Sequence, residues 1–102
     1  MSKLRWTQRA RRDLLEIARY IAADDPSAAR RQVAHLRRRA NAVARLPRSG
    51  RRVPELPADD LREAVVKNYR LIYRLEYRLE QGGITVLTVF ETHHRFPRDL
   101  PG

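Results

Sequence analysis

The sequence contains no cysteine, which excludes disulfides and thiolate-bound metals. It has no apolar run that approaches the roughly 20 residues needed for a membrane-spanning helix. The N-terminal stretch MSKLRWTQRARRD also lacks the apolar core of a signal peptide. We therefore expect a protein that does not enter a membrane and that resides in the cytoplasm. Without cysteine, its stability cannot depend on disulfides.

Acidic residues and lysines are also scarce. There are 12 aspartates and glutamates against 22 lysines and arginines, which gives a formal net charge of +10. All the basic residues are arginines except Lys3 and Lys67. Arginine makes planar, bidentate contacts with carboxylates and phosphates that lysine cannot make. This composition predicts an anionic partner, either nucleic acid or an acidic protein.

The length and the apolar content predict one folded domain over residues 1–102. A chain of 102 residues fits the usual size of a single domain. Hydrophobic residues make up 42% of it, enough to form a core although 33% of the residues are charged.

The first half of the chain predicts a short strand at residues 4–7 and then two helices. Thr7 is suited to cap the first helix, and Asp25 with Pro26 is suited to begin the second. The short break at residues 24–26 predicts an antiparallel hairpin. The apolar stripes that define the two helices are Ala10, Leu14, Ile17, Ala18 and Ile21, and Ala29, Val33, Leu36, Ala40 and Val43.

The second half predicts a loop at residues 47–59 and then three strands. The strands span residues 61–66, 69–79 and 84–90, because hydrophobicity alternates there with a period of two. Asn68 is expected to adopt the left-handed conformation in the first turn, and Gly82 with Gly83 forms the second. The last strand is apolar on both faces, so it should lie centrally in the sheet.

These elements predict an α+β fold of order β-α-α-β-β-β. An N-terminal strand and an antiparallel two-helix hairpin would pack on one face of a small, mainly antiparallel sheet. The tyrosines and leucines of the strand at 69–79 would face the helices. Arg70, Arg74 and Arg78 would then lie over an apolar floor on the opposite face, which predicts a groove for an anion or an acidic peptide.

His93, His94 and Arg95 follow the last strand and allow two interpretations. They could form a polar tail that binds a partner. Alternatively, Arg70, His94 and Arg95 could cleave RNA through its 2′-hydroxyl, because histidine can transfer a proton and arginine can stabilise the transition state. The adjacent histidines with one nearby Glu91 match no closed ligand spacing, so the sequence predicts no metal and no cofactor.

Three stretches together resemble the ParE/RelE superfamily of type II toxin-antitoxin toxins, with the ParE-like branch favoured. They are WTQRARRDLLEIARYIAADD at residues 6–25, PRSGRRVPEL at 47–56 and LREAVVKNYRLIYRL at 61–75. The tail TVFETHHRFP also fits the last strand of that family. The resemblance implies a toxin that a tightly bound acidic antitoxin neutralises in a hetero-oligomer. It also implies contact with DNA only indirectly, through the antitoxin.

The resemblance leaves the target open. ParE-like toxins inhibit DNA gyrase without a recognised hydrolytic site, whereas RelE-like toxins cut mRNA on the ribosome. Arg70 and Arg95 fall where RelE-like enzymes use arginines, but this chain lacks their C-terminal tyrosine and their loop lysines, with Arg51 and Arg52 at the loop. We therefore favour a gyrase inhibitor with no catalytic residues. The alternatives are a RelE-like ribonuclease that uses Arg70, His94 and Arg95, and a non-toxic interaction module.

The same reasoning gives a set of residues expected to bind the antitoxin or the target. They are Arg62, Tyr69, Arg70, Arg74, Arg78, Phe90, His93 and Arg95.

Overall fold

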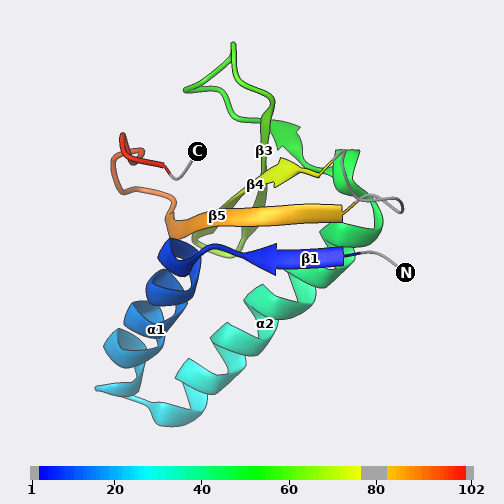
Figure 1. Ribbon diagram of the computed structural model, residues 1–102. Coiled ribbons are helices and arrows are strands. Elements are labelled where there is room, and N and C mark those ends of the chain that lie inside the picture. The colour runs from blue at the N-terminus through cyan, green and yellow to red at the C-terminus, as the bar shows by residue number, and fades with distance from the viewer. Residues whose placement is uncertain (1–2, 77–82, 101–102) are drawn as a thin grey trace.

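The computed structural model describes residues 3–76 and 83–100 (Figure 1). It confirms the predicted order and adds a short 3-10 turn and a two-residue strand in the loop. The elements are β1 (Lys3–Trp6), α1 (Gln8–Ala22), α2 (Pro26–Arg45), η1 (Pro47–Ser49), β2 (Arg51–Arg52), β3 (Leu61–Val66), β4 (Tyr69–Leu75) and β5 (Gly83–Glu91). Within the described residues, no helix is long and apolar enough to cross a membrane.

The sheet has five strands in the order β1-β5-β4-β3-β2. β1 runs parallel to β5, and the other neighbours are antiparallel. β5 therefore lies between β1 and β4, as its two apolar faces predicted. The part of the predicted 69–79 strand at residues 77–79, which includes Arg78, lies outside the described residues, as does Gly82.

Side chains cap both helices at the predicted positions. The hydroxyl Oγ1 of Thr7 accepts a hydrogen bond from the Ala10 amide at 3.0 Å, and Asp25 Oδ1 accepts one from the Ala28 amide at 3.1 Å. Each cap satisfies an amide that has no partner within its helix. Thr7 also donates to the Leu87 carbonyl of β5 at 2.9 Å, so one side chain begins α1 and fastens it to the sheet.

The first turns of α1 lie beside β5, beyond the point where β1 ends. Asp13 Oδ2 accepts hydrogen bonds from the Thr88 hydroxyl at 2.5 Å and from the Val89 amide at 3.1 Å. The Asp13 carboxylate thus accepts a hydrogen bond from a backbone amide of β5 that lies beyond the end of β1. The sequence pattern had placed Asp13 outside the apolar stripe and gave it no role.

The turn between β3 and β4 differs from the prediction. Lys67, and not Asn68, has a positive φ, of 56°. Val66 pairs with Tyr69 across the two strands, so Lys67 and Asn68 form a two-residue turn. The positive φ is needed at the first of these two residues, which is Lys67. Asn68 instead supplies a carbonyl that accepts from the Thr92 amide at 2.8 Å.

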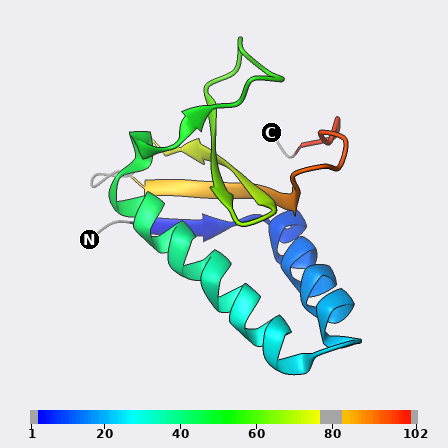
Figure 2. The ribbon, with the colours of Figure 1, turned by 180° about the vertical axis from the view of Figure 1, so that it is seen from behind.

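The hairpin of α1 and α2 covers one face of the sheet, and the core lies between them (Figures 1 and 2). The loop at residues 53–60 and the tail after β5 rise away from the helices. As predicted, the tyrosines and leucines of β4 enter the core beside the helices. These side chains are Tyr69, Leu71, Tyr73 and Leu75.

Tyr73 links this core to the turn that follows α2. Its side chain is fully buried, and its hydroxyl donates to the Pro47 carbonyl at 2.7 Å. The same oxygen accepts from the Gly50 amide at 3.0 Å. A Cβ at position 50 would collide with the Tyr73 hydroxyl and with the Glu63 carbonyl, so glycine is required there.

We predict that Tyr73→Phe lowers the free energy of unfolding by about 1–3 kcal/mol, because it leaves the buried Gly50 amide and the partly buried Pro47 carbonyl without their partner. Urea unfolding followed by circular dichroism measures this loss. Tyr20→Phe is the matched control, since Tyr20 is 77% exposed on α1 and should change stability little. Equal losses in the two variants would contradict this role for the Tyr73 hydroxyl.

Candidate functional site

Arg70 was expected to lie exposed on the open face of the sheet, and the structure buries it instead. It lies on β4 between Tyr69 and Leu71 and points to the face away from the helices, but its side chain is only 9% exposed. The loop at residues 53–60 and the tail after β5 contribute the groups that cover it. A polar residue on the open face of a sheet is accessible only if no loop folds over it, and here two segments do.

Two carboxylates neutralise the buried Arg70. Its Nε donates to Glu63 Oε1 at 2.9 Å, and its Nη2 makes a further, shorter contact with the same oxygen. Nη1 and Nη2 donate to the two carboxylate oxygens of Glu55 at 2.6 and 2.7 Å. Glu63 has no exposed side-chain surface and also accepts from Arg51 Nε at 2.6 Å. Arg51, Glu55, Glu63 and Arg70 form a charge-balanced network, which we call the Arg70 cluster.

Two aromatic rings complete the environment of Arg70. Its guanidinium carbon lies 5.3 Å from the ring centroid of Phe90 on β5 and 5.3 Å from that of Phe96 in the tail. The two rings meet edge to face with centroids 5.7 Å apart. Cation–π contacts at this distance strengthen when water is excluded. Phe96 was not among the residues singled out from the sequence, and only its contact with Arg70 reveals its role.

The Arg70 cluster shifts the titration of its members. Hydrogen bonds from Arg70 are the main cause that lowers the pKa of Glu55 below its usual value of 4.5. In turn, the hydrogen bonds to Glu55 are the main cause that raises the pKa of Arg70. Both groups therefore stay charged at neutral pH, and each satisfies the other.

We predict that Arg70→Met lowers the free energy of unfolding by about 3 kcal/mol, because the fully buried Glu63 side chain loses one of its two arginine partners. This is the low end of the usual range for a broken buried ion pair, since Arg51 still contacts Glu63. Arg74→Met is the matched control on the same strand. The Arg74 side chain is 39% exposed and pairs with Glu76 at 3.2 Å, so its loss should cost under about 1 kcal/mol. Urea unfolding that shows similar losses for both would contradict the burial argument.

The lowered pKa of Glu55 makes the stability of the protein depend on pH. A carboxyl whose pKa is lower in the folded state stabilises the fold above its unfolded pKa, near 4.5, and this contribution disappears as the pH falls through the folded pKa. We predict that Glu55→Gln makes the loss of stability below pH 4.5 less steep. Thermal unfolding across the acid range measures the slope. In the Arg70→Met variant, Glu55→Gln should leave the slope unchanged. If Glu55→Gln still changes the slope there, a group other than Arg70 lowers the pKa of Glu55.

A groove of about 550 Å³ does lie on the sheet face away from the helices. Its charge differs from the expectation, because Asp59 and Asp60 line it together with Arg74 and Arg98. Arg74 lines it as predicted, whereas Arg70 does not. The residues that shape it are Leu56, Asp59, Arg74, Leu87, Arg98 and Leu100. A groove with this balance has an apolar floor but no strong preference for an anion.

The other residues expected to bind a partner are scattered. Arg62 is half-buried, and its Nη1 donates to the Gly50 carbonyl at 2.8 Å. Tyr69 is buried in the core, which raises the pKa of its hydroxyl. His93 and Arg95 are exposed in the tail, and Phe90 is half-buried at the end of β5. Of these five residues, Tyr69, Phe90 and Arg95 line one cleft at the start of the tail, whereas Arg62 and His93 are not among its lining residues.

The start of the tail brings His94 and Arg95 into one cleft, of about 390 Å³, against α1. Phe90 and Glu91 of β5 and Tyr20 of α1 also line this cleft. Arg70 is not among its lining residues. The three residues of the ribonuclease alternative are therefore divided between the buried Arg70 cluster and an exposed cleft.

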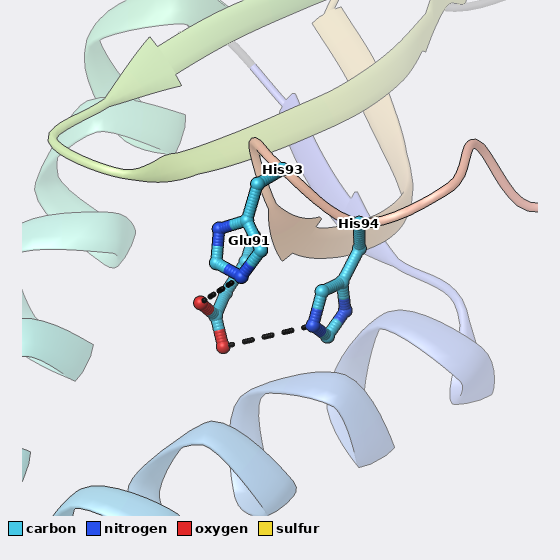
Figure 3. A group of neighbouring side chains, drawn as sticks. All are labelled: Glu91, His93 and His94. Carbon is cyan, nitrogen blue, oxygen red and sulfur yellow. Dashed lines mark ion pairs between the residues drawn. The ribbon is translucent and has the colours of Figure 1, made fainter.

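Glu91, His93 and His94 form a compact cluster at the same turn (Figure 3). His93 Nε2 lies 3.2 Å from Glu91 Oε2, and His94 Nε2 lies 4.0 Å from Glu91 Oε1. The imidazole rings meet edge to face with centroids 4.9 Å apart. Sequence spacing gave no reason to expect this approach, because it depends on the turn that follows β5.

The surplus of positive charge lies on the helices. α2 contains six arginines and no acidic residue. A second groove, of about 580 Å³, runs between α1 and α2 beside β1, with Trp6, Leu15 and Val33 along its floor. Arg11 and Arg37 flank it. The alternation of residues in β4 had predicted a cationic sheet face, although the absence of acidic residues in α2 is visible in the sequence.

Comparison with known proteins identifies the family. Residues 4–96 match the family described as the ParE toxin of type II toxin-antitoxin system, parDE. The chain belongs to the ParE toxin family. This ParE-family chain is 38% identical over 100 residues to the protein named "Putative toxin Y4kP" of Sinorhizobium fredii, with 96% of each chain covered.

A solved structure supports the same fold. The chain resembles a structure titled "Chromosomal ParDE TA system from P. aeruginosa" with a TM-score of 0.70. The match covers 91% of this chain and 98% of that one, at 19% sequence identity. The expected family is therefore confirmed, together with its α+β fold.

Proposed function

We propose that this ParE-family chain inhibits DNA gyrase when it is free, and that it does so by binding and without a hydrolytic step of its own. The observation that carries the proposal is the state of Arg70. A transition-state arginine must present free N–H donors to the developing charge. In Arg70, Nε, Nη1 and Nη2 already donate to Glu55 or Glu63. A phosphate would have to displace two carboxylates from a buried position.

One observation favours the ribonuclease alternative. His94 and Arg95 line the same cleft, which supplies a proton-transfer group beside a cation. This pair could act on RNA only with a substrate seated between the tail and α1. Arg95→Ala therefore separates the two functions, since Arg95 is exposed and its loss should not disturb the fold.

The antitoxin is best accommodated by the helical hairpin. We infer an acidic, amphipathic segment whose apolar side chains enter the groove between α1 and α2. Leu15 supports this, because it is 50% exposed on the floor of a groove flanked by arginines. Apolar anchors would give affinity, and the arginines of α2 would steer an acidic partner. The sheet groove would play the lesser part, because its aspartates oppose its arginines.

A supercoiling assay tests the proposed target. The purified chain should block supercoiling by DNA gyrase, and Arg95→Ala should block it equally well. Ribosome-bound mRNA should stay intact in the presence of either protein. Normal supercoiling at saturating protein would overturn gyrase as the target. Cleavage of mRNA that disappears in Arg95→Ala would establish the alternative.

The same assay tests neutralisation. The product of a short acidic reading frame beside this gene, added in equal amount, should restore supercoiling, and its association rate should fall as salt rises. Arg37→Glu on the hairpin should weaken this rescue. Arg98→Glu in the sheet groove is the matched control and should leave it nearly unchanged. A larger loss of rescue with Arg98→Glu than with Arg37→Glu would mean that the antitoxin binds the sheet groove instead.

A further inference from the structure

The cluster at the end of β5 has the donors of a metal site. It presents two imidazole nitrogens and a carboxylate, and their ligand atoms all lie within 4.8 Å of one another (Figure 3). Among residues 3–76 and 83–100, no other group of three histidines or carboxylates meets this condition. Glu91 faces both histidines, with one oxygen toward each.

The backbone beneath these side chains is fixed by hydrogen bonds. The His94 amide donates to the Glu91 carbonyl at 3.0 Å, which closes a turn. The Thr92 amide donates to the Asn68 carbonyl at 2.8 Å, and Glu91 pairs with Tyr69 across the sheet. The three donors therefore come from a turn anchored to the β3–β4 hairpin. Only side-chain torsions remain to be set when an ion binds, which reduces the entropic cost of binding.

We propose that Glu91, His93 and His94 bind one zinc ion. Two imidazoles and one carboxylate form a donor set that zinc accepts, whereas magnesium and calcium prefer oxygen alone. Zinc–nitrogen bonds of about 2.0–2.1 Å place tetrahedral ligand atoms roughly 3.3 Å apart. The pair formed by His93 and Glu91 already lies at 3.2 Å. The three ligand atoms lie within 4.8 Å of one another, so the widest pair must close by up to about 1.5 Å. The His94 side chain is 58% exposed, which leaves room for that movement.

The fourth coordination position of this zinc is open. Glu91 and His94 line the cleft against α1, so water or a small ligand in the cleft can complete the tetrahedron. This explains why sequence spacing did not predict the site, since that argument considered closed sets of four ligands. The net charge of +10 opposes a cation and therefore lowers the affinity of the site for zinc.

Zinc at this turn would also stabilise the tail. His94 lies two residues before Phe96, whose ring lies against Phe90 and the guanidinium of Arg70. A ligand that binds only the folded turn raises the stability of the folded state by RT ln(1 + L/Kd), where L is the free ligand concentration. The site would thus connect metal binding with the segment that covers the Arg70 cluster.

Isothermal titration of the full-length chain with zinc sulfate tests the proposal. The wild-type chain should bind one ion, and Glu91→Gln, His93→Ala and His94→Ala should each weaken binding by about tenfold or more. His35→Ala is the matched control, because His35 is exposed on α2 and contacts Arg38, far along the chain from the cluster. It should bind as the wild type does. Absence of saturable binding by the wild type would overturn the site.

A second measurement tests the site even if the heat of zinc binding is too small for calorimetry. Zinc should raise the melting temperature of the wild type and of His35→Ala but not that of the combined variant His93→Ala with His94→Ala. NMR signals of the His93 and His94 rings should move with zinc, while those of His35 stay in place. A zinc response that persists in the combined variant, or that moves His35 instead, would also overturn the proposal. Neither result depends on whether gyrase is the target.

Discussion

The pairing of one buried arginine with two carboxylates holds the sheet face away from the helices together. Arg70 on β4 joins Glu63 on β3, Glu55 in the loop and the ring of Phe96 in the tail. The loop precedes β3 and the tail follows β5, so this arginine joins segments from before and after the three-strand meander. Burying a guanidinium is costly unless each donor finds a partner. The loop and the tail must therefore adopt the positions that they have, and the shape of the open-face groove follows from them.

The distribution of charge follows from the same pairing. The arginine that the alternation of β4 placed at the centre of the open face is neutralised, and the groove beside it mixes arginines with aspartates. The unbalanced arginines remain on the hairpin, where α2 carries no acidic residue. The two helices carry a net +8, from ten arginines against Asp13 and Glu16, so most of the overall +10 lies in one layer of the fold. An acidic partner is attracted to the helices, and the sheet contributes shape more than charge.

Local patterns predicted the elements, and contacts between distant segments determined the rest. Thr7 and Asp25 cap the helices, and β5 is central, because capping chemistry and apolar faces are encoded in a few neighbouring residues. The face of Arg70 followed from alternation, but its burial depends on a loop 15 residues earlier in the chain, at Glu55. Similarly, Lys67 and not Asn68 takes the left-handed place because register decides it. The approach of His93 and His94 to Glu91 depends on a turn that no periodicity describes.

The attachment of α1 to β5 has a consequence for the borders of the sheet. Thr7 bonds to the Leu87 carbonyl, and Asp13 accepts from the Val89 amide, just where β1 stops. The start of α1 thereby covers the edge of β5 beyond the end of β1, so another chain cannot form backbone hydrogen bonds with β5 there. An extra strand, whether from a partner or from an aggregate, must join outside β1, outside β2 or along residues 64–66 of β3, which β2 does not cover. β1 and β2 are four and two residues long, and the uncovered part of β3 is equally short, so the fold offers little template for uncontrolled growth.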